Sequence, residues 1–207
     1  LPRGVTTVLS QGDAGARNWL EYKEQVIKKC RTRVLLAINL SDYGESHPDG
    51  CFPDLRAADV GKCISTILSD PEAIWGIAVN SGPSNPTPPH EIMNRALEVA
   101  EETGKPLLVG TRLINDWSLD EQLQLLRAGD IVTYCFHDFP ENLIQNGHVR
   151  HSVLDARDRG VLFDIGHGMR SFSFKIAEAA IANGFLPDAI STDQYARHVG
   201  SNPQHDL

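Results

Sequence analysis

Short apolar, β-branched runs recur along the chain, and amphipathic segments separate them. The runs are continuous rather than alternating, which is typical of parallel strands covered by helices. One run and one amphipathic segment together take about 30 residues, the size of a βα repeat. The pattern predicts strands over residues 4–9, 34–39, 74–79, 106–109, 131–135, 161–164 and 189–191, and helices over 18–29, 55–68, 91–102, 119–127, 149–159 and 174–183.

Local signals at the ends of the predicted helices support this assignment. The stretch Ser118-Leu-Asp-Glu121 has the form of a capping box ahead of the helix at 119–127. Gly104 and Gly184 each follow a helical pattern at the place where a C-terminal glycine belongs.

The strict alternation of strand and helix predicts an α/β fold with a parallel sheet, either open and doubly wound or closed into a barrel. Seven strands are visible, and a TIM-type (β/α)8 barrel needs one more. We favour the barrel and expect a single, partial barrel domain over residues 1–207, with neither the first strand nor a β-sandwich in this chain.

Composition narrows the classes of function. The chain has 207 residues and a net charge of −8, which argues against a nucleic-acid or anionic-membrane surface. No run of 18 apolar residues predicts a membrane span. The four cysteines, at positions 30, 51, 63 and 135, lack the close pairing of a zinc-thiolate site, and we expect buried free thiols in a reducing cytoplasm.

Polar side chains follow most of the predicted strands, at the carboxyl ends where parallel α/β proteins collect catalytic and ligand groups. Several His and Asp on one face would suit a metal site, an acid/base pair or an anion pocket. Segments 41–53 and 81–89 follow two of these strands as loops. The candidates at the strand ends are Asn39, Asp42, Asn80, Thr111, Arg112, Tyr134, His137, Asp138, Asp164, His167, Asp193, Gln194 and Tyr195.

Five phrases of the sequence resemble the amidohydrolase superfamily, closest to its dihydroorotase-like amidohydrolase/deacetylase group. The resemblance runs over essentially the whole chain and is strongest from Gly129 onward. The phrases are Gly4-Val-Thr-Thr-Val8, Gly129-Asp-Ile-Val-Thr-Tyr-Cys-Phe-His137, Arg159-Gly-Val-Leu-Phe-Asp-Ile-Gly-His-Gly168, Ser171-Phe-Ser-Phe174 and Gly184-Phe-Leu-Pro-Asp-Ala-Ile-Ser-Thr-Asp193.

The resemblance implies a metal-dependent barrel in which two divalent ions activate a water molecule. Such members carry a His-x-His pair on the first strand, a carboxylated lysine on the fourth, one histidine each on the fifth and sixth, and an aspartate on the eighth. Carried onto this sequence, the lysine position holds Ala78, and the two histidine positions hold Gly110 and Tyr134. Only Asp193 matches, so the resemblance implies a divergent member whose binuclear centre is lost.

Two functions stay open on these residues. The first is a hydrolase of an amide-like C–N or ester bond in a small molecule, with Asp193 as general base and as a weak metal ligand. The alternative is a non-catalytic homologue, or pseudoenzyme, that binds a small polar or anionic molecule, with the Gly166-His-Gly168 turn offering backbone N–H groups to a phosphate. In both, the substrate-binding candidates are Asn80, Arg112, Tyr134, His137 and His167.

The cofactor and the assembly also leave alternatives open. One divalent metal ion, with zinc as the expected metal, is one alternative, and no metal is the other. We expect a small-molecule substrate or ligand, no nucleic-acid partner and no membrane partner. The resemblance leaves both a monomer and a homo-oligomer open.

Overall fold

The computed structural model describes residues 4–46, 50–80, 87–111, 117–168 and 171–194. The chain divides into two compact units, residues 1–108 and residues 109–207. Both units are built from parallel strands and helices, so the predicted α/β class is confirmed. The expectation of a single domain over the whole chain stays a prediction.

In the first unit, three parallel strands lie side by side in chain order. They are β1 (Thr7–Gln11), β2 (Arg33–Asn39) and β3 (Ile74–Val79). The register places Gln11 opposite Ala37, and Asn39 opposite Ala78. The strands therefore end together, and the loops that leave β2 and β3 start at the same edge of the sheet.

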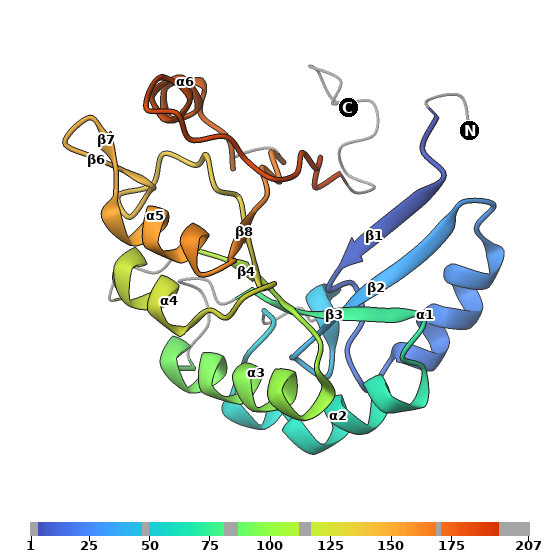
Figure 1. Cartoon of the computed structure of the whole chain (residues 1–207). Helices are drawn as coiled ribbons and strands as arrows, with labels where there is room; N and C mark the ends of the chain where they lie inside the picture. Colours follow the sequence, from blue (N-terminus) through green and yellow to red (C-terminus); the bar gives the residue numbers. More distant parts are fainter. Residues whose placement is uncertain (1–3, 47–49, 81–86, 112–116, 169–170, 195–207) are drawn as a thin grey trace. The chain divides into compact units, whose positions relative to one another are not determined.

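Helices follow each of these strands. They are α1 (Trp19–Gln25), α2 (Val60–Ser69) and α3 (Pro89–Thr103), with short 3-10 turns η1 (Ile27–Lys29), η2 (Gly44–Ser46) and η3 (Leu55–Ala57). Helices α2 and α3 pack side by side (Figure 1). Asp59 caps α2 by accepting a hydrogen bond from the Lys62 N–H, and α3 ends at Gly104 with a φ of 67°, as the sequence predicts. Strand β4 (Leu107–Gly110) crosses from the first unit into the second.

In the second unit, β5 (Ile131–Thr133) pairs in parallel with β8 (Leu162–Phe163). Helix α4 (Leu119–Leu125) packs against α5 (His151–Asp158), and α6 (Phe174–Ala182) follows β8 (Figure 1). Ser118 and Glu121 form the predicted capping box, and Gly184 follows α6 with a φ of 77°. The local signals for helix ends are therefore confirmed.

Some of the elements predicted in this unit differ from those observed. Residue Val149 does not start a helix but belongs to a hairpin, β6 (Ile144–Gln145) and β7 (His148–Val149), because Asn146 and Gly147 both have positive φ and form the tight turn that joins twisted strands. The predicted strand at 189–191 is reduced to one isolated bridge, between Asp164 and Ala189.

The apolar runs form the cores of the two units. Leu36, Ile38, Ile74 and Ile77 are completely buried in the first unit. In the second unit, Phe163 packs edge-on against Phe185, and both rings are buried. The continuous apolar pattern thus reports burial for β3 and β4, as predicted, whereas β1 is largely exposed, with Val8 42% and Leu9 54% exposed.

All four cysteines are free; Cys51, Cys63 and Cys135 are buried as expected, whereas Cys30 is exposed. Within the part of the chain that the structure describes, no helix is both long and apolar enough to cross a membrane.

The capping box gives a stability prediction. Ser118→Ala removes the hydroxyl that accepts from the Glu121 N–H, so we expect the free energy of unfolding to fall by about 1 kcal/mol. Urea titration measures this. The control is Ser65→Ala on α2, whose hydroxyl bonds only its own helix, and which we expect to change stability by less than about 0.5 kcal/mol. Equal effects of the two substitutions would contradict a capping role.

Candidate functional site

Tyr134 follows β5 directly and adopts a left-handed backbone conformation, with a φ of 64°. A bulky residue rarely adopts this conformation, and such outliers gather at functional sites. The ring is 2% exposed and lies against Gly166, where an added Cβ atom would be 2.9 Å from Tyr134 Cδ1 and 2.3 Å from Thr133 Oγ1. Glycine at 166 is therefore required by the packing, and the predicted strand 131–135 ends at Thr133 because Tyr134 leaves the extended conformation.

Asp164 joins two strand ends through one carboxylate oxygen. Its Oδ2 accepts hydrogen bonds from Thr133 Oγ1 at 2.8 Å and from Ser191 Oγ at 2.7 Å. Its Oδ1 is buried and has no hydrogen-bond partner. Burial raises the pKa of the Asp164 carboxyl, and the two hydroxyl donors offset only part of that rise. This carboxyl therefore fixes the ends of β5 and of the segment that precedes Asp193.

Asp193 ends a segment that runs beside the continuation of β8. The N–H groups of Ile165, His167 and Gly168 donate to the carbonyls of Ala189, Ser191 and Thr192, at 3.0–3.1 Å. Gly168 is held close to the Asp193 side chain, since an added Cβ atom would lie 2.8 Å from Asp193 Oδ2. Asp193 itself has a φ of 48°. The segment thus has a defined position at the carboxyl end of β8.

These hydrogen bonds correct one expectation. The Gly166-His-Gly168 turn does not present its last two N–H groups to a phosphate, because the N–H groups of His167 and Gly168 are used in pairing with residues 191 and 192. The prediction that this turn binds a phosphate through its backbone N–H groups is therefore wrong for His167 and Gly168. A role of the His167 imidazole in ligand binding stays a prediction.

His137 is 2% exposed, and its Nδ1 accepts a hydrogen bond from the Phe139 N–H at 3.2 Å. A backbone N–H can only donate, so Nδ1 carries no proton in this arrangement and the neutral ring is protonated at Nε2. The side chain is therefore held as one tautomer at the start of the loop after β5. Its proposed contact with a substrate stays a prediction.

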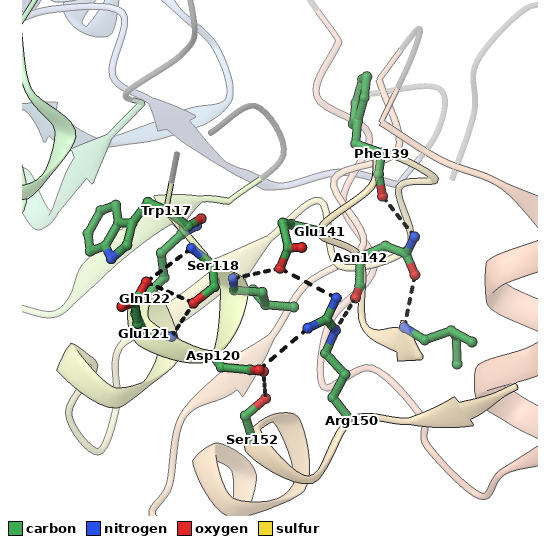
Figure 2. Close-up of polar contacts among 12 residues, drawn as sticks. Trp117, Ser118, Asp120, Glu121, Gln122, Phe139, Glu141, Asn142, Arg150 and Ser152 are labelled. Atoms are coloured by element: carbon green, nitrogen blue, oxygen red, sulfur yellow. Dashed lines mark hydrogen bonds and ion pairs between the residues drawn. The ribbon is translucent and has the colours of Figure 1, made fainter. Parts of the chain in front are cut away.

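A buried arginine holds the rest of that loop, as Figure 2 shows. Arg150 Nε donates to the Asn142 carbonyl at 2.8 Å, and its guanidinium pairs with Glu141 at 3.4 Å and Asp120 at 3.5 Å. Asn142 in turn donates to the Phe139 carbonyl at 2.7 Å. The planar fork of Arg150 thus ties the loop that carries His137 to α4.

In the first unit, a second polar group forms at the ends of β2 and β3. Asn80 Nδ2 donates to Glu45 Oε1 at 2.9 Å, and the completely buried Asn39 donates to the Gly12 carbonyl at 3.2 Å and to Glu45 Oε1 at 3.5 Å. The sequence reasoning missed Glu45, which lies in a loop with no motif. Its only signal was that the loop follows a predicted strand.

The other predicted strand-end residues have varied positions. Asp42 is buried and lies 3.4 Å from Arg17 and 3.6 Å from Lys62, Thr111 is buried, and Asp138 is exposed. Arg112 and Tyr195 lie outside the described residues. The structure places Asn80 in the first unit and Tyr134, His137, His167 and Asp193 in the second.

The residues at the positions of the implied binuclear centre do not fit two metal ions. Ala78 and Gly110 have no side-chain donor, and Tyr134 offers a phenol in place of imidazole. Ala78 is completely buried, and an added Cβ atom at Gly12 would lie 3.1 Å from its Cβ. Among the described residues, no three His, Cys, Asp or Glu side chains gather closely enough to hold an ion. Of the implied ligand positions that this chain contains, only Asp193 keeps a side chain that can bind a metal ion.

Comparison with known proteins gives the class first. No family model matches the chain. Two solved structures share its fold over 95% of its length: an adenine deaminase, with a TM-score of 0.85 and 29% identity, and a dihydroorotase, with a TM-score of 0.84 and 30% identity. The chain covers 54% and 55% of them. Both are TIM-barrel proteins, so the expected barrel class is confirmed.

Sequence relatives then give the family. A deacetylase of Enterococcus faecalis is 29% identical over 99% of this chain, and the deacetylase Atu3266 of Agrobacterium fabrum is 32% identical over 99% of it. The chain spans 56% and 51% of these relatives, about half their length. Together with the two structures, they place the chain in the amidohydrolase superfamily, as the resemblance implied.

The raised pKa of Asp164 gives a prediction about pH. The folded state keeps this carboxyl protonated at pH values where the unfolded chain ionises it, so the contribution of Asp164 to stability falls as pH rises from the ordinary aspartate pKa through the raised one. Asp164→Asn cannot ionise. We therefore expect the stability of the variant relative to the wild type to increase with pH over that window.

Urea unfolding at a series of pH values measures this difference. The control is Asp158→Asn, at an exposed position of α5. A stability difference between Asp164→Asn and the wild type that does not change with pH would show that the pKa of Asp164 is not raised in the folded protein.

Proposed function

We propose that this protein hydrolyses an amide-like C–N or ester bond in a small molecule, at the carboxyl ends of its strands, with an altered metal site. Support comes from relatives named deacetylases and from structural neighbours titled adenine deaminase and dihydroorotase. Because the chain spans about half of those relatives, the activity of the whole protein is part of the proposal.

The observation that carries the proposal is the placement of Asp193. Pairing of residues 189–192 with the continuation of β8 sets its backbone, and the close approach of Gly168 leaves its carboxylate at the strand end. A carboxylate there can take a proton from water as the water oxygen attacks the carbonyl carbon. The same proton can then pass to the departing nitrogen or oxygen. General base catalysis of this kind contributes about 10²–10⁴-fold to a rate.

We further propose that the site works without two metal ions. Ala78, Gly110 and Tyr134 stand where the resemblance assigns three ligands, and none is a good ligand for zinc. At most one divalent ion, zinc by resemblance, would then be bound. No step of the proposed reaction is assigned to it.

The same three substitutions favour a second candidate, a homologue that binds a small polar molecule and does not cleave it. In this case Tyr134, His137 and His167 of the second unit and Asn80 of the first would be binding residues, with Arg112 as a partner for an acidic group. Both candidates have a small-molecule ligand, and we propose a cytoplasmic location for either because all four cysteines are free.

The first test combines metal content and hydrolysis, measured on the full-length protein purified without chelators. We expect one metal equivalent or less by elemental analysis. In a panel of N-acetylated amines and acetate esters, we expect Asp193→Asn to lower kcat/KM about 10²–10⁴-fold, because its side chain cannot accept the proton. Asp158→Asn on α5 is the control and should keep the wild-type rate.

Each alternative result has a distinct meaning. Two metal equivalents would contradict the altered site. An active enzyme whose rate is unchanged by Asp193→Asn would contradict the role of Asp193. No hydrolysis by a folded protein whose melting temperature rises with members of the panel would favour the non-catalytic candidate.

A further inference from the structure

Arg150 is a buried cation that contacts both α4 and the loop after β5, as Figure 2 shows. Its side chain is only 7% exposed, and its guanidinium lies between the carboxylates of Asp120 and Glu141. Burying a guanidinium is costly unless nearby charges neutralise it, and these two carboxylates do so. They also fix the plane of the guanidinium, so that Nε is directed at the Asn142 carbonyl.

The two carboxylates are themselves anchored at the start of α4. Glu141 accepts a hydrogen bond from the Leu119 N–H at 3.1 Å, one of the N–H groups that lack a partner within the helix. Asp120 lies in the first turn of α4 and accepts from the Ser152 hydroxyl. Negative charge is favourable at the N-terminus of a helix. Arg150 is therefore held by a regular element as well as by the loop.

Asn142 carries this restraint from Arg150 further along the loop. Its carbonyl accepts from Arg150 Nε at 2.8 Å, and its Nδ2 donates to the Phe139 carbonyl at 2.7 Å. Its Oδ1 accepts from the Ile144 N–H at 2.9 Å. Because one end of the amide meets a carbonyl and the other meets an N–H, the side chain has a single orientation. The backbone at Phe139 is thus fixed through the residue that Arg150 holds.

Phe139 in turn contacts His137 in two ways. Its N–H donates to His137 Nδ1 at 3.2 Å, and the centroids of the two rings lie 5.4 Å apart with an interplanar angle of 47°. The hydrogen bond requires an Nδ1 without a proton, and the ring contact fixes the imidazole plane. Three hydrogen bonds in series therefore connect the buried guanidinium of Arg150 to the imidazole of His137.

We propose that Arg150 is a positioning residue that acts through Asn142 and Phe139 on His137, and selects the tautomer whose proton is on Nε2. Loss of the first hydrogen bond of the series frees the Phe139 backbone to turn its N–H away from Nδ1, which lets the other tautomer form. The part that His137 takes in ligand binding rests on the proposed function, whereas the choice of its tautomer does not.

Heteronuclear NMR of the His137 ring nitrogens in the full-length protein tests this, because a protonated and an unprotonated nitrogen differ widely in chemical shift. The signals are assigned by their absence in His137→Gln, and the ratio of tautomers is measured where the ring is neutral. Arg150→Lys keeps the charge but loses the planar fork that reaches Asn142. We expect it to lower the ratio of the Nε2–H to the Nδ1–H form about fivefold, as loss of one hydrogen bond does.

A second variant tests the middle of the series if Arg150→Lys fails to fold. Asn142→Asp keeps an acceptor for the Ile144 N–H but has no donor for the Phe139 carbonyl, so we expect the same change in the tautomer ratio. The matched control is Arg159→Lys, because Arg159 donates to the Leu123 carbonyl outside the series. It should keep the wild-type ratio. Thermal unfolding shows which variants are folded.

An unchanged tautomer ratio in a folded Arg150→Lys or Asn142→Asp protein would overturn the inference, as would an equal change in the Arg159→Lys control. Hydrolysis by the same variants separates this result from the proposed function. If the amide and ester panel is cleaved, we expect Arg150→Lys and His137→Gln to raise KM and to leave kcat nearly unchanged, as loss of a binding contact does.

The two proposals can therefore fail independently. Hydrolysis by a protein whose tautomer ratio does not respond to Arg150→Lys overturns only the positioning role of Arg150. A tautomer ratio that responds, in a protein that hydrolyses nothing, overturns only the proposed reaction.

Discussion

In the second unit, the positions of the strand ends depend on the hydrogen bonds of one buried carboxyl group, that of Asp164. One of its oxygens receives hydroxyl groups from Thr133 and Ser191, which lie next to Tyr134 and two residues before Asp193. Burying this group is costly, and the raised pKa expresses that cost. The hydroxyl bonds and the parallel pairing of residues 165–168 with 189–192 offset it. The positions of Tyr134 and Asp193 are therefore linked through one buried residue.

In the first unit, the buried side chains at the strand ends are neutral. Completely buried amide and methyl side chains, Asn39 and Ala78, stand side by side on β2 and β3. The charged residue, Glu45, comes from the loop and stays exposed. Its charge is therefore closer to solvent than that of Asp164.

Periodicity and helix-end signals predicted most of the fold because they depend on neighbouring residues alone. Most of the apolar runs form parallel strands, although β1 is largely exposed, and Ser118, Gly104 and Gly184 mark helix ends as expected. The hairpin at 144–149 departs from the predicted helix start at Val149 because the Asn146-Gly147 turn, with positive φ at both residues, pairs Val149 with Ile144. Glu45 could not be found this way. Its partners Asn39 and Asn80 are 6 and 35 residues away, and only the folded loop brings them together.

The close packing of Gly12 against Ala78 limits which side chains position 78 can hold. The backbone at Gly12 approaches so closely that even one added methyl group there would lie 3.1 Å from Ala78. A long, charged side chain at position 78 would therefore meet the end of β1 and the amide of Asn39 before it reached open space. A lysine at position 78, the residue that the resemblance assigns there, would therefore strain the packing before it could serve as a ligand. Accommodating it would need a compensating change at a neighbouring position such as Asn39.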